Sequence, residues 1–176
     1  MRSRVVAVVV AVLASILSAA VPATAQPSPT PTRLCLNAHL ADIGWQGWVC
    51  GDDGAQVQVG TTGQGRRIEA VALTTWGTGG VCAQALPALA LPAPQLPVWW
   101  PQVCVGEGEM AVVGTTGRSL PIQAIRVGTG TRAVCLNGHV GGDGWLGISC
   151  AGPGSTAQSG KLYPWRQMES LIAWIA

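Results

Sequence analysis

A threefold internal repeat is the feature that most constrains how this chain folds. The segment Cys-Leu-Asn-Ala-His at 35–39 recurs as Cys-Leu-Asn-Gly-His at 135–139, and in both copies Gly-Trp and a second cysteine follow at identical spacing. A middle copy begins at Cys82, is interrupted from Leu86 to Val98, and returns to the pattern at Trp99. Self-similarity of this kind indicates one small structural unit copied along the chain.

Each copy carries two further markers. A glycine lies ten residues after each trailing cysteine, at Gly60, Gly114 and Gly160, and an apolar segment starts eight residues later. We expect a turn at each glycine and a β-strand over 67–73, 121–127 and 167–173. The units then cover about 34–80, 81–133 and 134–176, which together form a single domain over 34–176.

The six cysteines permit fifteen pairings in principle, and the repeat selects one. Because each unit contains its own pair, the predicted bridges are Cys35–Cys50, Cys82–Cys104 and Cys135–Cys150. No pair has the short spacing of a zinc site, so we expect neither a metal nor another cofactor.

The first bridge also sets the register of a predicted hairpin. If Cys35 faces Cys50, then Asn37 lies opposite Trp48, His39 opposite Gln46 and Leu40 opposite Trp45. Leu36, Leu40 and Trp45 then share the face that we assign to the core. We therefore expect the three homologous tryptophans, Trp45, Trp99 and Trp145, to fill the interior around a pseudo-threefold axis.

Short strands and frequent turns predict an all-β fold. Glycine and proline supply 24 and 12 of the 176 residues, which disfavours long helices. A single small sheet would expose an apolar face and open edges, so three must close on one another. We expect a pseudo-threefold β-prism of three short antiparallel sheets, one per unit; a β-trefoil is the alternative.

The N-terminal segment indicates secretion. Residues 1–25 combine two arginines, an apolar stretch and a small-x-small pattern at 23–25, as secretory signal peptides do, and 26–33 read as a Pro/Thr-rich linker. After cleavage we expect a secreted, extracellular protein with no membrane attachment. Removing Arg2 and Arg4 reduces Lys+Arg from 10 to 8 against 8 Asp+Glu. A neutral body excludes nucleic acid and anionic membranes as partners.

Catalysis is not expected from this sequence. The acidic residues are scattered, the cysteines are committed to bridges, and neither histidine belongs to a recognisable catalytic arrangement. Glu69 and Glu169, with Gln123 between them, occupy one slot of the repeat, which indicates a shared hydrogen-bonding role such as satisfying the backbone N–H groups of a turn. Asp52-Asp53-Gly54 is expected to be a plain turn, with weak cation binding as the alternative.

Two surfaces are candidates for binding. In the first, Trp48 lies near Asn37, His39 and Gln46, an aromatic platform bordered by polar groups that suits a sugar ring; Asn137 and His139 form a weaker copy. Alternatively, Trp48 only covers the disulfide or packs on a neighbouring unit. The second surface is the Pro-rich loop 87–101 with Trp99 and Trp100, which suits contact with an extracellular protein or an inhibitory role.

The first unit has a recognisable pattern. His-Leu-Ala-Asp-Ile-Gly-Trp-Gln-Gly-Trp-Val at 39–49, Gly-Thr-Thr-Gly-Gln at 60–64 and Arg-Ile-Glu-Ala-Val at 67–71 resemble the ChW repeat, named for its hydrophobic character and conserved tryptophan. The resemblance covers 34–176 as three tandem copies, although the cysteines and the insertion 87–97 depart from it. It implies a noncatalytic binding or adhesion module, secreted or displayed on bacterial cells. The leading hypothesis is a secreted module that binds polysaccharide, wall glycan or other cell-surface material.

Overall fold

The computed structural model describes residues 31–88, 98–164 and 166–176. Within these ranges the regular secondary structure consists of β-strands alone. No helix there is long and apolar enough to cross a membrane. The expected signal peptide, most of the linker and the centre of the Pro-rich loop lie outside the described residues.

The strands follow the three repeats. The first supplies β1 (Arg33–Leu40), β2 (Gly44–Trp45), β3 (Val49–Asp52), β4 (Val57–Gly60) and β5 (Ile68–Trp76). The second supplies β6 (Val81–Pro87), β7 (Val103–Val105), β8 (Ala111–Gly114) and β9 (Ile122–Thr129). The third supplies β10 (Val134–Val140), β11 (Gly144–Trp145), β12 (Ser149–Ala151), β13 (Thr156–Gly160) and β14 (Met168–Ile175).

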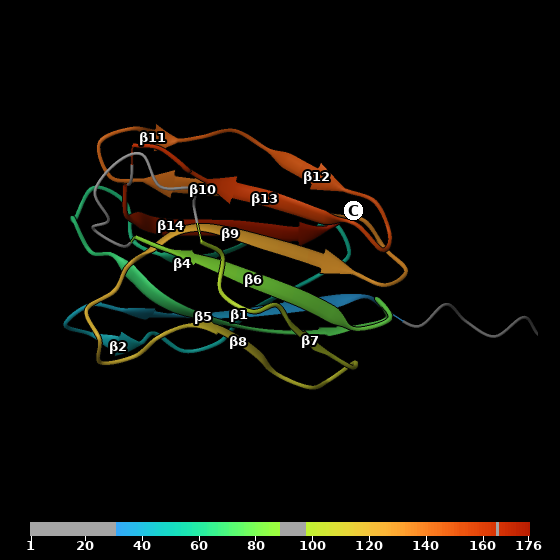
Figure 1. The fold of residues 1–176 in the computed structure, drawn as a ribbon. Helices are drawn as coiled ribbons and strands as arrows, with labels where there is room; N and C mark the ends of the chain where they lie inside the picture. The colour runs from blue at the N-terminus through green and yellow to red at the C-terminus, as the bar shows by residue number, and fades with distance from the viewer. Residues whose placement is uncertain (1–30, 89–97, 165) are drawn as a thin grey trace, which may run out of the picture.

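Three antiparallel sheets pack around a common core (Figure 1). Their strand orders are β2-β1-β5-β8 with β3 also on β1, β13-β9-β6-β7, and β11-β10-β14-β4 with β12 also on β10. No closed barrel forms in the described chain, so the β-prism-like prediction is confirmed and the β-trefoil alternative is not.

The expectation of one sheet per repeat is wrong. Each sheet takes its outer strand from the next repeat: β8 joins β5, β13 joins β9, and β4 of the first repeat joins β14 of the third. The exchange closes the three sheets into a ring, because the first and last repeats are joined by the β4–β14 pair. The spacing of the markers shows where a strand lies along the chain but not which repeat supplies its partner.

The marker glycines are the places where this exchange occurs. Gly60, Gly114 and Gly160 have φ values of +90°, +99° and +114°, a conformation that side chains disfavour. A Cβ at any of them would overlap the backbone of the neighbouring repeat's last strand. The residue after each glycine donates its N–H to that strand: Thr61 to the Glu169 oxygen at 2.8 Å, Thr115 to Glu69 at 2.9 Å, and Lys161 to Gln123 at 3.2 Å.

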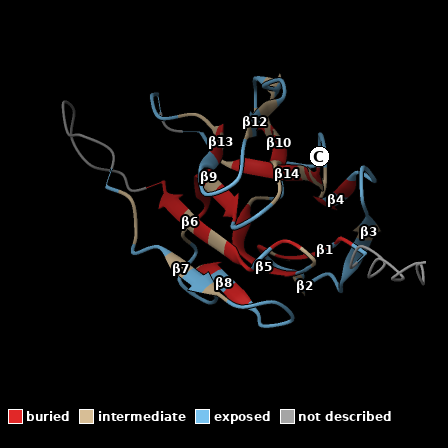
Figure 2. Ribbon diagram, turned by 90° about the vertical axis from the view of Figure 1, so that its right-hand side faces the viewer, coloured by how far each residue is buried: buried red, intermediate tan, exposed pale blue. Residues whose placement is uncertain are grey.

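The core is aliphatic. Figure 2 shows the buried residues on the inner strands, whereas β3 is largely exposed and β7 partly exposed at the periphery. The largest fully buried side chains are Leu34, Leu36, Leu40, Ile68, Leu73, Leu86, Ile122, Ile125, Leu136, Met168, Leu171 and Ile175. All three predicted disulfides are present: Cys35–Cys50, Cys82–Cys104 and Cys135–Cys150.

The prediction that tryptophans fill the core is wrong. Trp45 and Trp145 are 42% and 40% exposed, and Trp99 is partly exposed. Near the disulfide the predicted register holds, but closer to the turn His39 pairs with Trp45 and Leu40 with Gly44. The turn after Leu40 has three residues instead of the expected four. Because Cys35 still faces Cys50, the segment between β2 and β3 contains one residue more than the expected register allows. A one-residue shift turns a side chain to the opposite face, so Trp45 joins His39 instead of Leu40.

Candidate functional site

A histidine, a tryptophan and a buried carboxylate come together on the outer side of the first repeat. The rings of His39 and Trp45 meet edge to face with centroids 5.4 Å apart. His39 Nδ1 lies 3.4 Å from Glu69 Oε2, and the Glu69 side chain is only 5% exposed. The Arg67 guanidinium approaches the other carboxylate oxygen, Oε1, with Nε at 3.2 Å and Nη2 at 3.1 Å. The buried charge of Glu69 is therefore matched by a cation from the residue that precedes β5.

The third repeat contains a second copy with one difference. His139 and Trp145 meet at 5.2 Å, and His139 Nδ1 lies 3.4 Å from Glu169 Oε2. The Glu169 side chain is 6% exposed. Gln167 stands where the first repeat has an arginine, and its amide donates to Glu169 Oε1 at 3.4 Å. The buried carboxylate of this copy therefore receives a long neutral hydrogen bond in place of a guanidinium.

A β-bulge places the carboxylate in each cluster. His39 pairs with Ala70 and Leu40 with Ile68, which leaves Glu69 as an extra residue on β5. The same irregularity occurs at Glu169 and at Gln123. Bulges re-aim side chains and free main-chain groups from the ladder. The expected shared slot therefore exists, but it is the main-chain oxygen that accepts the turn N–H, while the carboxylate of Glu69 or Glu169 faces a histidine.

The second repeat does not reproduce the cluster. Leu86 and Gln123 occupy the histidine and glutamate positions. The Arg126 guanidinium lies 4.0 Å from the centre of the Trp99 ring, and the Gln84 amide donates to the Trp100 carbonyl at 2.8 Å. Both predicted protein-contact tryptophans are thus half-buried and held by contacts within the chain.

Several predicted ligand-binding side chains serve the hairpin itself. Asn37 Oδ1 accepts the Gly47 N–H at 3.0 Å, and Asn137 makes the equivalent bond to Gly147 at 3.1 Å. Gln46 Oε1 accepts the Gly60 N–H at 2.7 Å. These side-chain oxygens fix the segments between β2 and β3 and between β11 and β12, which are not strands. An ideal hairpin register assumes continuous strands there and so does not predict this role.

Trp48 has the exposed position that the sugar-binding prediction requires. Its side chain is 46% exposed and lies on the same hairpin as Trp45. Neighbouring apolar side chains on this hairpin are also exposed, namely Ile43 and Val49. In the third repeat the exposed apolar side chains of this hairpin are Trp145, Leu146 and Ile148, and Ile148 replaces the second tryptophan. Asp143 and Ser149 stand in place of Ile43 and Val49.

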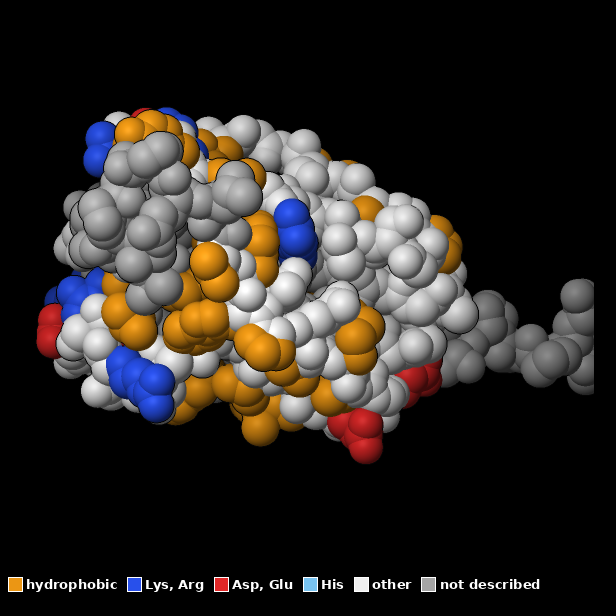
Figure 3. All heavy atoms as spheres, viewed as in Figure 1, with side chains coloured by type: hydrophobic (Ala, Val, Ile, Leu, Met, Phe, Trp, Pro, Cys, Tyr) orange, Lys and Arg blue, Asp and Glu red, His pale blue; other side chains and the backbone are white. Residues whose placement is uncertain are grey.

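Apolar surface is not confined to the hairpins. Figure 3 shows hydrophobic side chains gathered over the lower half of one face, where Figure 1 places β7 and β8, with few charges among them. Val112 on β8 and the adjacent Met110 are 37% and 56% exposed.

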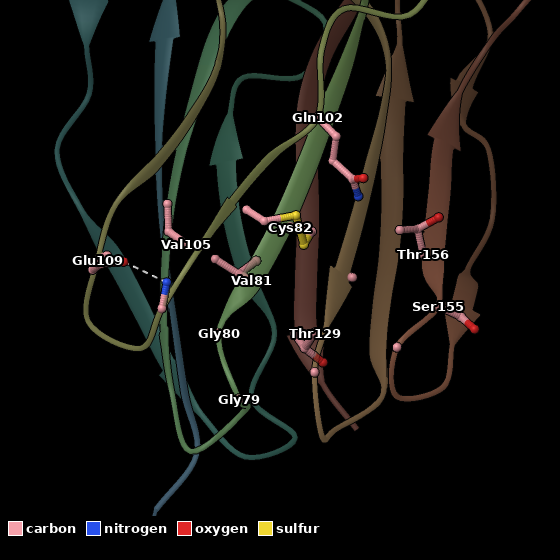
Figure 4. Close-up of a pocket in the computed structure, with 15 residues that line it drawn as sticks. Gly79, Gly80, Val81, Cys82, Gln102, Val105, Glu109, Thr129, Ser155 and Thr156 are labelled. Carbon is pink, nitrogen blue, oxygen red and sulfur yellow. Dashed lines mark hydrogen bonds between the residues drawn. A yellow bond between two sulfur atoms is a disulfide. The ribbon is translucent and has the colours of Figure 1, made fainter.

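A hollow of about 370 Å³ lies beside the second disulfide, and Figure 4 shows Gln102, Cys82 and Thr156 among the residues that line it. Gly128 pairs with Cys82 here, whereas the equivalent partners of the other bridges are Thr74 and Trp174. Without a side chain at 128, the Cys82–Cys104 bridge is left uncovered. Cys82 is accordingly partly exposed, while Cys35 and Cys135 are buried.

Two exposed carboxylates join loops. Asp53 accepts hydrogen bonds from Arg132 Nη2 at 2.7 and 2.8 Å, which links the first repeat to the end of the second. The Thr32 hydroxyl and the Arg132 guanidinium lower the pKa of Asp53. Glu107 accepts the Gly79 N–H at 2.7 Å, and this bond chiefly lowers the pKa of Glu107.

No group of three or more His, Cys, Asp or Glu side chains in the described ranges is arranged to hold a metal ion.

Fold and clusters together define a disulfide-linked, β-prism-like repeat domain with outward-facing Trp–His–Glu groups. Residues 39–74 match the model of the ChW family, described as Clostridial hydrophobic W. The matched segment lies in the first repeat and contains His39, Trp45 and Glu69. No curated protein and no solved structure matches the chain.

Proposed function

We propose that this protein is a secreted, noncatalytic module of three ChW-like units that binds glycan on a cell surface or cell wall. The observation that carries the proposal is the pair of half-exposed tryptophans, Trp45 and Trp48, on one disulfide-braced hairpin. The electron-rich face of an indole attracts the polarised C–H groups of a sugar ring, and a rigid aromatic side chain loses little entropy on binding.

The polar surroundings of Trp45 support binding rather than chemistry. The His39 ring packs edge to face with the Trp45 indole, and the Glu69 carboxylate lies against His39. These contacts orient the indole before a ligand binds. The Glu69 carboxylate is engaged by His39 and Arg67. A carboxylate bound in this way positions its neighbours, whereas a general base needs access to a substrate proton.

Extracellular location fits the covalent structure. Each repeat is closed by its own disulfide, and disulfides form and persist in oxidising compartments. The exposed apolar hairpins are consistent with a surface that functions by contact.

The test is retention of the secreted protein on insoluble cell-wall polysaccharide, followed by a glycan array. Trp48→Ala and Trp45→Ala should each reduce retention at least tenfold, because each removes a stacking surface. Trp76→Ala is the matched control, since Trp76 is 37% exposed but lies on β5, outside the hairpin. Ile148→Trp should increase retention by giving the third repeat the second tryptophan of the first. If both hairpin variants are retained like the unaltered protein, glycan binding at this surface is wrong.

A further inference from the structure

The third repeat has a cavity at its buried carboxylate. About 380 Å³ of space is lined by Gly141, Gly142, Arg166, Gln167 and Glu169. The space is open to solvent rather than enclosed. At the base of the cavity, Glu169 is 96% buried as a residue, being only 4% exposed.

The first repeat shows what belongs in this position. There, the guanidinium of Arg67 contacts Glu69 Oε1 through Nε at 3.2 Å and Nη2 at 3.1 Å. In the third repeat the residue at that place is Gln167, whose amide also donates to the Gly65 carbonyl at 3.0 Å. The amide is therefore shared between two acceptors, and the only contact it gives Glu169 Oε1 is the 3.4 Å bond. The two guanidinium contacts of the first repeat are thus replaced in the third by one long amide contact, beside the space that Gln167 and Glu169 line.

A second substitution keeps the carboxylate accessible. Gly141 occupies the place of Ala41 in the first repeat, and a Cβ at Gly141 would lie 2.9 Å from Glu169 Oε1. With glycine at 141, no methyl group lies against Oε1, and Gly141 and Glu169 both line the cavity. Two differences between the copies, at positions 141 and 167, thus both reduce the number of contacts around Glu169 Oε1.

Two nearby cations, Lys161 and Arg166, lie close to Asp143. Lys161 Nζ lies 3.0 Å and Arg166 Nε 3.8 Å from Asp143 Oδ2. His139 Nδ1 is near Oε2, the other oxygen of Glu169, but it is buried and makes no hydrogen bond in the described structure. A buried carboxylate without a matching cation is costly, and a ligand that brings one recovers that cost.

We propose that this cavity binds a guanidinium group, specifically an arginine side chain of a protein partner, in the position that Arg67 occupies in the first repeat. A guanidinium supplies several N–H donors in a fixed plane, so it can contact Glu169 Oε1 through two nitrogens as Arg67 does with Glu69. The Gln167 side-chain oxygen provides a second acceptor. The inference does not depend on glycan binding, since it requires neither Trp45 nor Trp48 of the first repeat.

Calorimetric titration of the full secreted protein with N-acetyl-arginine amide tests the proposal. The citrulline analogue has nearly the same shape but no charge, and it should bind at least tenfold more weakly. Glu169→Gln should abolish binding, and its fold should persist because the second repeat has Gln123 in this slot. Gln167→Arg should also abolish binding, since the new side chain would occupy the cavity from within.

A gain of binding gives the sharper test. The double variant Arg67→Gln, Ala41→Gly recreates the third-repeat arrangement in the first repeat and should raise the stoichiometry from one to two. Circular dichroism confirms that each variant is folded. N-acetyl-lysine amide and glucosamine carry a positive charge without the guanidinium plane and should bind more weakly than N-acetyl-arginine amide. Equal binding of the citrulline analogue, unchanged affinity in Gln167→Arg, or equal or tighter binding of the lysine compound or glucosamine would overturn the guanidinium assignment. Glycan retention through Trp48 is measured separately, so failure of one proposal leaves the other testable.

Discussion

Replacing a marker glycine should open the ring of sheets. In Gly60→Ala the new Cβ would overlap the Glu169 carbonyl, at the point where β4 joins β14. The side chain also has to adopt a φ of +90°, which costs about 1–2 kcal/mol for a non-glycine residue. If the strand end moves away, the Glu169 main-chain oxygen loses the Thr61 N–H at 2.8 Å. Losing such a buried bond costs about 1–3 kcal/mol.

The sum is about 2–5 kcal/mol of unfolding free energy. Gly63→Ala is the matched control, because Gly63 also has positive φ, +67°, but a Cβ there would meet no atom within 4 Å. It should cost only the conformational part, about 1–2 kcal/mol. Denaturant unfolding with intact disulfides, followed by tryptophan fluorescence, measures both values. If the two variants are equally destabilised, close approach to the third repeat is not the reason for glycine at position 60.

Three further predictions concern pH, the disulfides and the core. Because folding lowers the pKa values of Asp53 and Glu107, their contribution to the unfolding free energy is present above the ordinary carboxyl pKa of about 4 and is lost as pH falls through the lowered values. In Glu107→Gln the unfolding free energy should therefore fall less steeply as the pH is lowered. Limited reduction and mass mapping should show the Cys82–Cys104 bridge opening first, since Gly128 leaves it uncovered. Leu171→Ala, at a fully buried position on β14, should cost about 2–5 kcal/mol in denaturant unfolding, and a loss below 1 kcal/mol would contradict its place in the core.

The sequence predicted the parts of the fold that are local. The bridges are local because each cysteine pairs within its own repeat, and the strand after each marker follows from its apolar residues. The exchange of β4, β8 and β13 between repeats is a long-range pairing, and three equivalent copies offer equivalent partners. Only the closed structure shows which partner is chosen.

The candidate site was predicted less well for a different reason. Its histidines and Trp48 were found, but Trp45 and Trp145 were assigned to the core because an ideal hairpin register was assumed. The role of Glu69 depends on a bulge, which inserts one residue into β5 and has no strong sequence signal. The recurrence of glutamate or glutamine at that slot was the available clue, and it identified a shared position without indicating what the side chain faces.

The bulge links the closure of the ring to the chemistry of the surface. At Glu169 the main-chain oxygen accepts the N–H of Thr61 from the first repeat, while the side chain lies against His139 on its own sheet. One residue therefore joins two repeats through its backbone and builds a polar site with its side chain. Because the oxygen bonded to Thr61 and the carboxylate belong to the same residue, the geometry of the cavity depends on β4 being in place. The third-repeat site is thus a property of the closed ring, and an isolated third repeat would lack the strand that holds its carboxylate in position.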